Sequence, residues 1–207
     1  MNRSLRIRHT HRALRRLSFR AGSFLASCIA LILMAHAPSA STQVAQPPSE
    51  AEIRAAFILN FAKFTEWPAE VFADAETPLT VGFVGADDAR TAFAALSTGK
   101  EINGRKIVVL QLDSVLKARQ CQILFFRKSN GDFAVGALEV ANVSRTLTIG
   151  EAENFLTRGG MIRLFVDDNR MRFDVNVGAA TRSKIRLSSK LLALAHTVVN
   201  LPVPGGD

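Results

Sequence analysis

The sequence contains few of the side chains from which catalytic and metal sites are usually built. Its 207 residues include two cysteines, four histidines, one tryptophan and no tyrosine. Three of the histidines and one of the cysteines lie within the first 36 residues. The rest of the chain offers only Cys121 and His196, too few for the common zinc sites built from cysteine and histidine. We therefore expect no enzymatic activity, no metal and no cofactor.

Two arrangements of side chains would contradict that expectation: a catalytic pair and a calcium site. Cys121 and His196 could meet in space as a nucleophile and its base. However, Cys121 introduces an apolar strand, which favours a buried structural thiol, and His196 falls in an apolar stretch that favours a core histidine on a helix. Asp167, Asp168 and Asp174 could collect calcium, but they lack the regular ligand spacing and are explained by a turn.

Acidic residues are absent from the first 40 positions, which hold seven of the 26 lysines and arginines. The remaining 19 basic residues face 18 acidic ones, so the rest of the chain is near neutral and nucleic acid is a poor candidate partner. A basic segment to Arg20, an apolar run over 21–37 and small residues after it predict a signal peptide over 1–40. Cleavage is expected between Ala37 and Ala45, although the 17-residue run also leaves an uncleaved anchor open.

Alternating helical and strand patterns predict a single α/β domain over 49–200, after a linker over 41–48 and before a flexible tail over 201–207. The expected fold is a mainly parallel mixed sheet flanked by helices, with a C-terminal antiparallel hairpin and a final helix. We expect helices over 50–66, from Asp87 or Asp88 to about 96, and over 113–119, 133–143, 151–156 and 183–199. We expect strands over 79–85, 107–112, 122–127 and 146–149.

The stretch 159–181 is predicted to be a hairpin in the sheet, because two alternating runs flank the polar turn Asp167–Arg170. Side chains alternate across a strand, so Met171, Phe173, Val175 and Val177 share one face, which we assign to the core. The opposite face carries three polar side chains: Arg172, Asp174 and Asn176. This face is available for function.

A candidate binding site combines the polar hairpin face with the end of the first helix. The hairpin contributes Arg163, Arg172, Asp174 and Asn176, and the helix end contributes Asn60 and Trp67. Asn60 stands in an apolar stripe, where a buried amide needs hydrogen-bond partners. Guanidinium, amide and indole groups together suit a small anionic or aromatic molecule, or a peptide. The alternative is a solvated sheet face with internal ion pairs.

Seven segments, in order, resemble the YfiR family of periplasmic regulators and span positions from about 50 to 199. They are 56–68 (AFILNFAKFTEWP), 104–105 (GR), 121–126 (CQILFF), 147–150 (LTIG), 159–162 (GGMI), 173–176 (FDVN) and 187–192 (LSSKLL).

The resemblance implies a periplasmic α/β domain, often a homodimer, that represses an inner-membrane diguanylate cyclase by binding its periplasmic sensor region. Cyclic-di-GMP and biofilm formation would fall under this repression, and an outer-membrane lipoprotein could sequester the repressor. Family members with paired cysteines can use disulfides, whereas Cys121 has no partner in the exported part of this chain. A second function left open is a periplasmic small-molecule-binding protein that reports to a sensor kinase.

Overall fold

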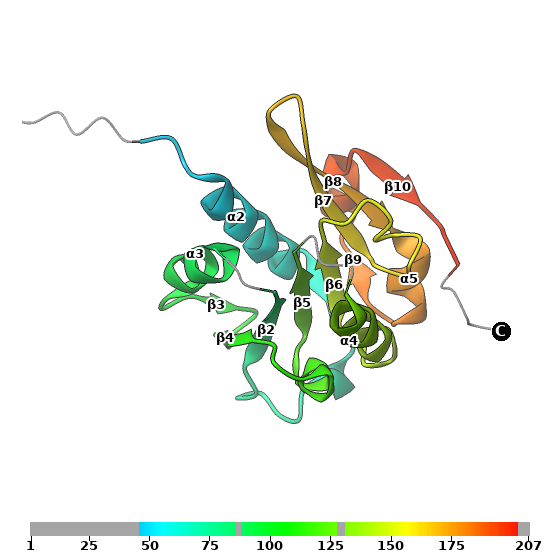
Figure 1. Ribbon diagram of the computed structural model, residues 1–207. Helices are drawn as coiled ribbons and strands as arrows, with labels where there is room; N and C mark the ends of the chain where they lie inside the picture. The colour runs from blue at the N-terminus through cyan, green and yellow to red at the C-terminus, as the bar shows by residue number, and fades with distance from the viewer. Residues whose placement is uncertain (1–45, 86–87, 128–130, 203–207) are drawn as a thin grey trace, which may run out of the picture. The chain divides into compact units, whose positions relative to one another are not determined.

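An eight-stranded mixed sheet forms the centre of the computed structural model, which describes residues 46–85, 88–127 and 131–202 (Figure 1). Across the sheet, the strands are β10 (Thr197–Val199), β8 (Arg170–Asn176), β7 (Ile162–Asp167), β6 (Leu147–Gly150), β5 (Ile123–Phe126), β2 (Leu79–Val84), β4 (Arg105–Gln111) and β3 (Glu101–Ile102). Neighbouring strands run parallel, except for the antiparallel pairs β7–β8 and β3–β4. The expected mainly parallel mixed sheet is confirmed.

Helices cover both faces of this sheet (Figure 1). On one face, α2 (Glu50–Lys63) and α3 (Asp88–Ser97) pack on a core that includes Phe61, Phe83 and Phe125. On the other face, α4 (Asp132–Val143) and the 3-10 helix η2 (Val115–Gln120), where an α-helix was expected, enclose a smaller apolar cluster. The remaining elements are β1 (Thr65–Glu66), the 3-10 helix η1 (Ala69–Val71), α5 (Val177–Arg182), β9 (Arg186–Leu187) and α6 (Ser189–Leu194). Among the described helices, none has the length and apolar character needed to cross a membrane.

The first helix begins where its capping box predicts. The Ser49 hydroxyl accepts a hydrogen bond from the Glu52 backbone N–H, and the Glu52 carboxylate accepts one from the Ser49 backbone N–H. The helix ends at Lys63, three residues before the expected end. The chain leaves the helix early because Thr65 and Glu66 pair with β9 as a short strand.

The predicted hairpin is confirmed, except that its second strand ends at Asn176 and Val177 begins α5; it closes through a two-residue turn. Asp167 pairs with Arg170, which leaves Asp168 and Asn169 as the turn residues. Both have positive φ, 46° and 56°, as a type I′ turn requires. Short polar side chains tolerate this left-handed backbone well.

The predicted final helix over 183–199 is wrong. The chain instead forms β9, α6 and β10, after a left-handed residue at Lys184 with φ 55°. Ser188 caps α6, which ends at Leu194. The β-branched run that follows pairs in parallel with β8 and becomes the edge strand of the sheet. Pairing with a strand distant in sequence therefore overrides the local helical pattern.

The predicted short helix over 151–156 is also wrong, because residues 153–159 form successive turns. The ring of Phe155 folds back against two glycines, Gly150 and Gly160. A Cβ at either glycine would lie within 2.4 Å of that ring. This close approach holds the segment against the end of β6.

Candidate functional site

One face of the β7–β8 hairpin carries polar and aromatic side chains opposite one another. The register pairs Arg163 with Asp174 and Phe165 with Arg172. Directly opposed residues of antiparallel strands project to the same face. Three of the predicted site residues, Arg163, Arg172 and Asp174, therefore do lie together.

Asp174 is the centre of this arrangement. Its side chain is only 12% exposed and contacts an Arg163 terminal nitrogen at 3.4 Å and His196 Nδ1 at 3.1 Å. The prediction of a core histidine on a helix is wrong, because His196 precedes β10 and its side chain is 45% exposed. The neighbouring strand β10 brings it to Asp174, since Thr197 pairs with that residue.

Phe165 completes the cluster as its apolar member. The Arg163 guanidinium lies 4.7 Å from the centre of the Phe165 ring, within reach of a cation–π interaction. The imidazole of His196 approaches the same ring edge-on, with 5.5 Å between ring centres. We call Arg163, Phe165, Asp174 and His196 the hairpin cluster; it places an ion-paired guanidinium, an imidazole and an aromatic ring on one face of the hairpin.

Arg172 lies on the same face, nearer the turn. Its Nε is 2.8 Å from a carboxylate oxygen of Asp167, and both side chains are more than one-third exposed. Ion pairs this exposed contribute at most about 1 kcal/mol to stability. The pair of Arg172 and Asp167 therefore adds little to the stability of the hairpin.

A pocket of about 710 Å³ lies beside the hairpin. Its volume is in the range of about 300–1,000 Å³ that is usual for ligand sites. One wall comes from β7 and β8, and the other from the first turns of α2 and the segment after β6. The lining residues are Glu50, Arg54, Glu151, Ala152, Glu153, Arg163, Leu164, Phe165, Val166 and Met171.

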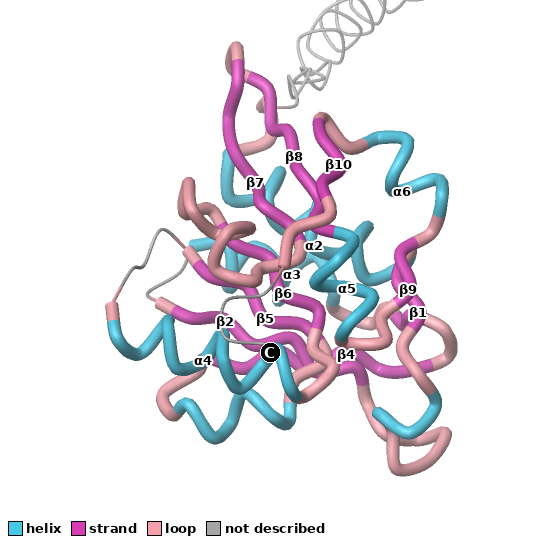
Figure 2. Tube along the Cα trace, turned by 90° about the vertical axis from the view of Figure 1, so that its right-hand side faces the viewer, coloured by secondary structure: helices cyan, strands magenta, loops and turns pink. Residues whose placement is uncertain are grey.

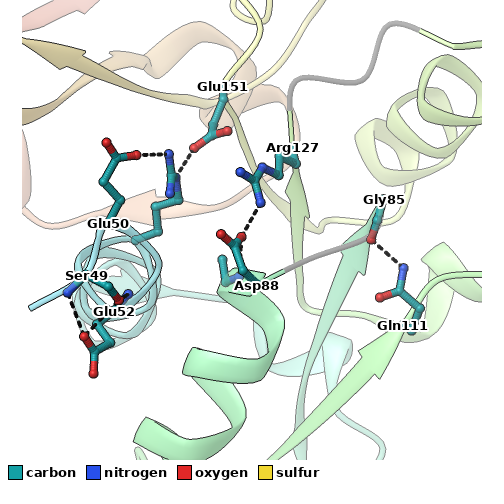
Figure 3. A network of polar contacts seen from close by, with 10 residues as sticks. Ser49, Glu50, Glu52, Gly85, Asp88, Gln111, Arg127 and Glu151 are labelled. Atoms are coloured by element: carbon teal, nitrogen blue, oxygen red, sulfur yellow. Dashed lines mark hydrogen bonds and ion pairs between the residues drawn. The ribbon is translucent and has the colours of Figure 1, made fainter.

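A buried ion pair fixes the wall opposite the hairpin (Figure 3). Arg54 Nε is 2.5 Å from Glu151 Oε1, and a terminal nitrogen of Arg54 is 2.8 Å from Glu50 Oε2. Burial disfavours the charge of Arg54, but the hydrogen bonds and charges of Glu151 and Glu50 outweigh it and raise the pKa of Arg54. The wall is consequently anchored between α2 and the end of β6.

Further polar contacts join the loops at the carboxyl ends of the parallel strands, where α/β sheets commonly bind ligands (Figure 3). Arg127, which follows β5, pairs with Asp88 at the start of α3. The Gln111 amide donates to the Gly85 carbonyl at 2.8 Å, from β4 to the end of β2. These contacts tie neighbouring loops together beside the pocket.

Asn176 is not part of an open face, which corrects the prediction. The residue is fully buried, and its side-chain oxygen accepts hydrogen bonds from the backbone N–H groups of Ala179 and Leu201. Its amide donates to the Leu156 carbonyl at 3.3 Å. Asn176 therefore caps α5 and joins it to two neighbouring segments.

Asn60 and Trp67 also lie away from the hairpin cluster. Asn60 is exposed, so its amide does not need the buried partners that its apolar neighbours suggested. Trp67 is half-buried, packs edge-on against Phe72 and donates its indole N–H to the Gln122 carbonyl at 3.2 Å. Gln122 precedes β5, whereas Arg163 aligns with the last residues of β5 and β6. Trp67, which is bonded to Gln122, and Arg163 therefore lie toward opposite ends of these strands.

Cys121 is a buried thiol, as the sequence favours. It is 2% exposed, its sulfur contacts the Lys117 carbonyl at 3.6 Å, and burial raises its pKa to about 11. At neutral pH such a thiol is protonated and a poor nucleophile. The described contacts of the His196 side chain are with Asp174, Thr197 and Phe165, and Cys121 is not among them. Among the described residues, no group of three or more His, Cys, Asp or Glu side chains could hold a metal ion.

Sequence reasoning missed four residues of this region: Phe165, His196, Arg54 and Glu151. The spacing of Glu50 and Arg54, one helical turn apart, is a local signal for their pair. Phe165 alternates with Arg163 along β7 and could have been placed on the polar face. The sequence holds no comparable signal for His196 or Glu151, because distant strands bring them to their partners.

Comparison with known proteins places this chain in a family. Its sequence matches the YfiR/HmsC-like family over residues 51–196, and no curated protein matches it. Two solved structures align with 72% of this chain and 60% of their own length. They are a conserved domain protein from Vibrio cholerae (16% identity, TM-score 0.48) and the ABC domain in complex with L-Trp from Streptococcus pneumoniae (11%, 0.46). The family match spans most of the described domain, and the chain belongs to the YfiR/HmsC-like family.

Proposed function

We propose that this protein is a periplasmic regulator that binds the periplasmic sensor region of an inner-membrane diguanylate cyclase and represses it. Membership of the YfiR/HmsC-like family is the observation that carries the proposal. The hairpin cluster supports it, because arginine and aromatic side chains are enriched in protein-binding sites. Lower cyclic-di-GMP and less biofilm would follow from the repression.

For repression, the regulator needs only to bind the inactive arrangement of the sensor region more tightly than the active one. A sensor region exchanges between active and inactive arrangements, and a bound protein shifts that exchange by the ratio of its affinities for the two. The regulator would bind the inactive arrangement more tightly, as a homodimer if it follows the resemblance. An outer-membrane lipoprotein that competes for the regulator would release the cyclase.

The experiment measures cyclic-di-GMP in cells that lack the gene and in cells complemented with variants. Deletion should raise cyclic-di-GMP, and the wild-type gene should restore the original level. Arg163→Gln should fail to restore it, because the change removes the guanidinium of the hairpin cluster. Arg119→Gln is the matched control, since Arg119 is exposed on η2, outside the hairpin cluster.

The thermal stability of both purified variants separates lost binding from lost folding. A folded Arg163→Gln protein that no longer binds the purified sensor region would support the proposed surface. An unchanged cyclic-di-GMP level after gene deletion would refute the repressor function.

A further inference from the structure

The β3–β4 hairpin lies at the end of the sheet farthest from β10 and turns through an asparagine and a glycine (Figure 2). Ile102 pairs with Arg105, which leaves Asn103 and Gly104 as the two turn residues. Their φ angles are 51° and 75°, and both residues are exposed. This left-handed backbone is typical of an Asn-Gly type I′ turn. The turn also presents a chemically labile asparagine to solvent.

The lability of an asparagine depends on the backbone nitrogen of the residue that follows it. At this turn the Gly104 nitrogen would give up its proton and bond to Cγ of Asn103, while the side-chain nitrogen leaves as ammonia. The product is a five-membered succinimide, which water opens at either carbonyl. One opening gives aspartate, and the other gives isoaspartate, in which the main chain runs through the former side-chain carbon. The sequence of steps consumes only water and needs no oxidant or reductant.

The structure distinguishes Asn103 from Asn169, the asparagine of the other two-residue turn. Gly104 has no side chain to hinder the attack, and a Cβ placed there would have no neighbour within 4 Å. The hydrogen bond that closes such a turn is donated by the residue after it, which is Arg105 here and Arg170 in the β7–β8 hairpin. The nitrogen that would attack Asn169 is therefore engaged in the closing bond, whereas the Gly104 nitrogen is not part of it.

The remaining asparagines of the described ranges are followed by bulky residues, which hinder ring closure. They are Asn60, Asn142, Asn154, Asn176 and Asn200, and the residues after them are phenylalanine, valine, phenylalanine, valine and leucine. Asn130 also precedes a glycine in the sequence, but it lies outside the described residues. Among the described asparagines, Asn103 therefore has the least hindered neighbour.

The residue after the turn gives the modification a structural consequence. A terminal nitrogen of Arg105 donates to three backbone carbonyls of the loop over 74–77, at 2.7, 2.8 and 3.1 Å. The guanidinium carbon of Arg105 also lies 3.8 Å from the centre of the Phe72 ring. Isoaspartate adds a carbon to the main chain inside the turn, so the two-residue geometry that pairs Ile102 with Arg105 is lost.

We propose that Asn103 is a site of spontaneous modification, where ring closure by Gly104 yields aspartate and isoaspartate, and that isoaspartate opens the β3–β4 hairpin. Strand β3 consists of Glu101 and Ile102, so it has no further pairs with β4 to hold it once the turn is altered. The site lies at the opposite end of the sheet from the strands of the hairpin cluster. The inference therefore goes beyond the proposed function and does not depend on it.

Trypsin allows a direct test, because cleavage after Lys100 and Arg105 releases residues 101–105 as one peptide. The purified exported protein is incubated at mildly alkaline pH, which promotes loss of the Gly104 amide proton, and is digested at intervals. The 101–105 peptide should gain the mass that separates a carboxylic acid from an amide. Chromatography should resolve it into aspartate and isoaspartate forms. The 164–170 peptide, which contains Asn169, is the internal control and should keep its mass.

A variant and an exchange measurement complete the test. Asn103→Ser removes the amide while keeping a residue suited to turns, so its 101–105 peptide should keep its mass. Ion exchange isolates the modified protein, which carries an additional negative charge. In its isoaspartate form the Arg105 amide should exchange hydrogen faster than in the unmodified protein. A 101–105 peptide of unchanged mass, or equal conversion of the 101–105 and 164–170 peptides, would overturn the site. Undiminished protection of the Arg105 amide in the isoaspartate form would overturn the opening of the hairpin.

Discussion

At the scale of single residues, two buried polar groups on the same strand differ in their hydrogen-bond partners. Asp174 and Asn176 are two positions apart and point to the same face of β8, yet their surroundings differ. Asp174 has an exposed histidine and an arginine as partners, which places it at the surface end of the face. Asn176 is enclosed by α5, Leu156 and Leu201, and its three hydrogen bonds are all to backbone groups. Because the Asn176 amide is hydrogen-bonded to the backbone through both its nitrogen and its oxygen, its role is structural.

We predict that Asn176→Ala lowers the free energy of unfolding by about 2–4 kcal/mol, because it removes a helix cap and leaves buried backbone groups unpaired. Asn60→Ala is the matched control. Asn60 is exposed on α2, so its loss should change stability by about 0.5 kcal/mol or less. Urea denaturation of both variants measures the difference. Equal stability of the two variants would show that Asn176 is not the cap that the structure describes.

At the scale of elements, the sequence predicts those whose signals are local. The capping box at Ser49, the turn at Asp168–Asn169 and the buried strand β5 each follow from neighbouring residues, and all are confirmed. The final helix is wrong because residues 197–199 pair with β8, more than twenty positions earlier. The candidate site divides in the same way: Arg163, Arg172 and Asp174 come from one hairpin, whereas His196 reaches them through that distant pairing.

The segment after β6 offers a test of a contact that no local pattern predicts. Gly160→Ala would place a Cβ 2.3 Å from the Phe155 ring, and such overpacking costs about 1–3 kcal/mol. Gly136→Ala is the control, because Gly136 lies within α4 and its added Cβ would meet only Val115, at 3.6 Å. Alanine there should stabilise the helix by about 0.5–1 kcal/mol. The midpoint of thermal unfolding should therefore fall in Gly160→Ala and rise in Gly136→Ala. A higher midpoint for Gly160→Ala would contradict the close packing of Phe155 on Gly160.

At the scale of the whole molecule, the strongly basic character and the folded domain belong to different parts of the chain. The sequence has a pI of about 10.3, but seven arginines and no acid lie in the first 40 residues. The predicted signal peptide over 1–40 lies outside the described residues. The described unit begins near Pro47, and its buried core starts within α2. The segment proposed to direct export therefore ends, in the sequence, before the described unit begins.

We predict that the exported protein begins between residues 38 and 46 and that a protein starting at Pro47 melts within about 2 °C of it, because the described buried core begins only at Ala55. Mass spectrometry of the periplasmic fraction gives the first residue. Ser49→Ala in the shorter protein is the matched control, because losing the cap costs about 1 kcal/mol and lowers the melting temperature by about 2–4 °C. A full-length product in the membrane fraction would instead identify residues 21–37 as an anchor. A large loss of stability in the protein that starts at Pro47 would mean that the leader contributes to the fold.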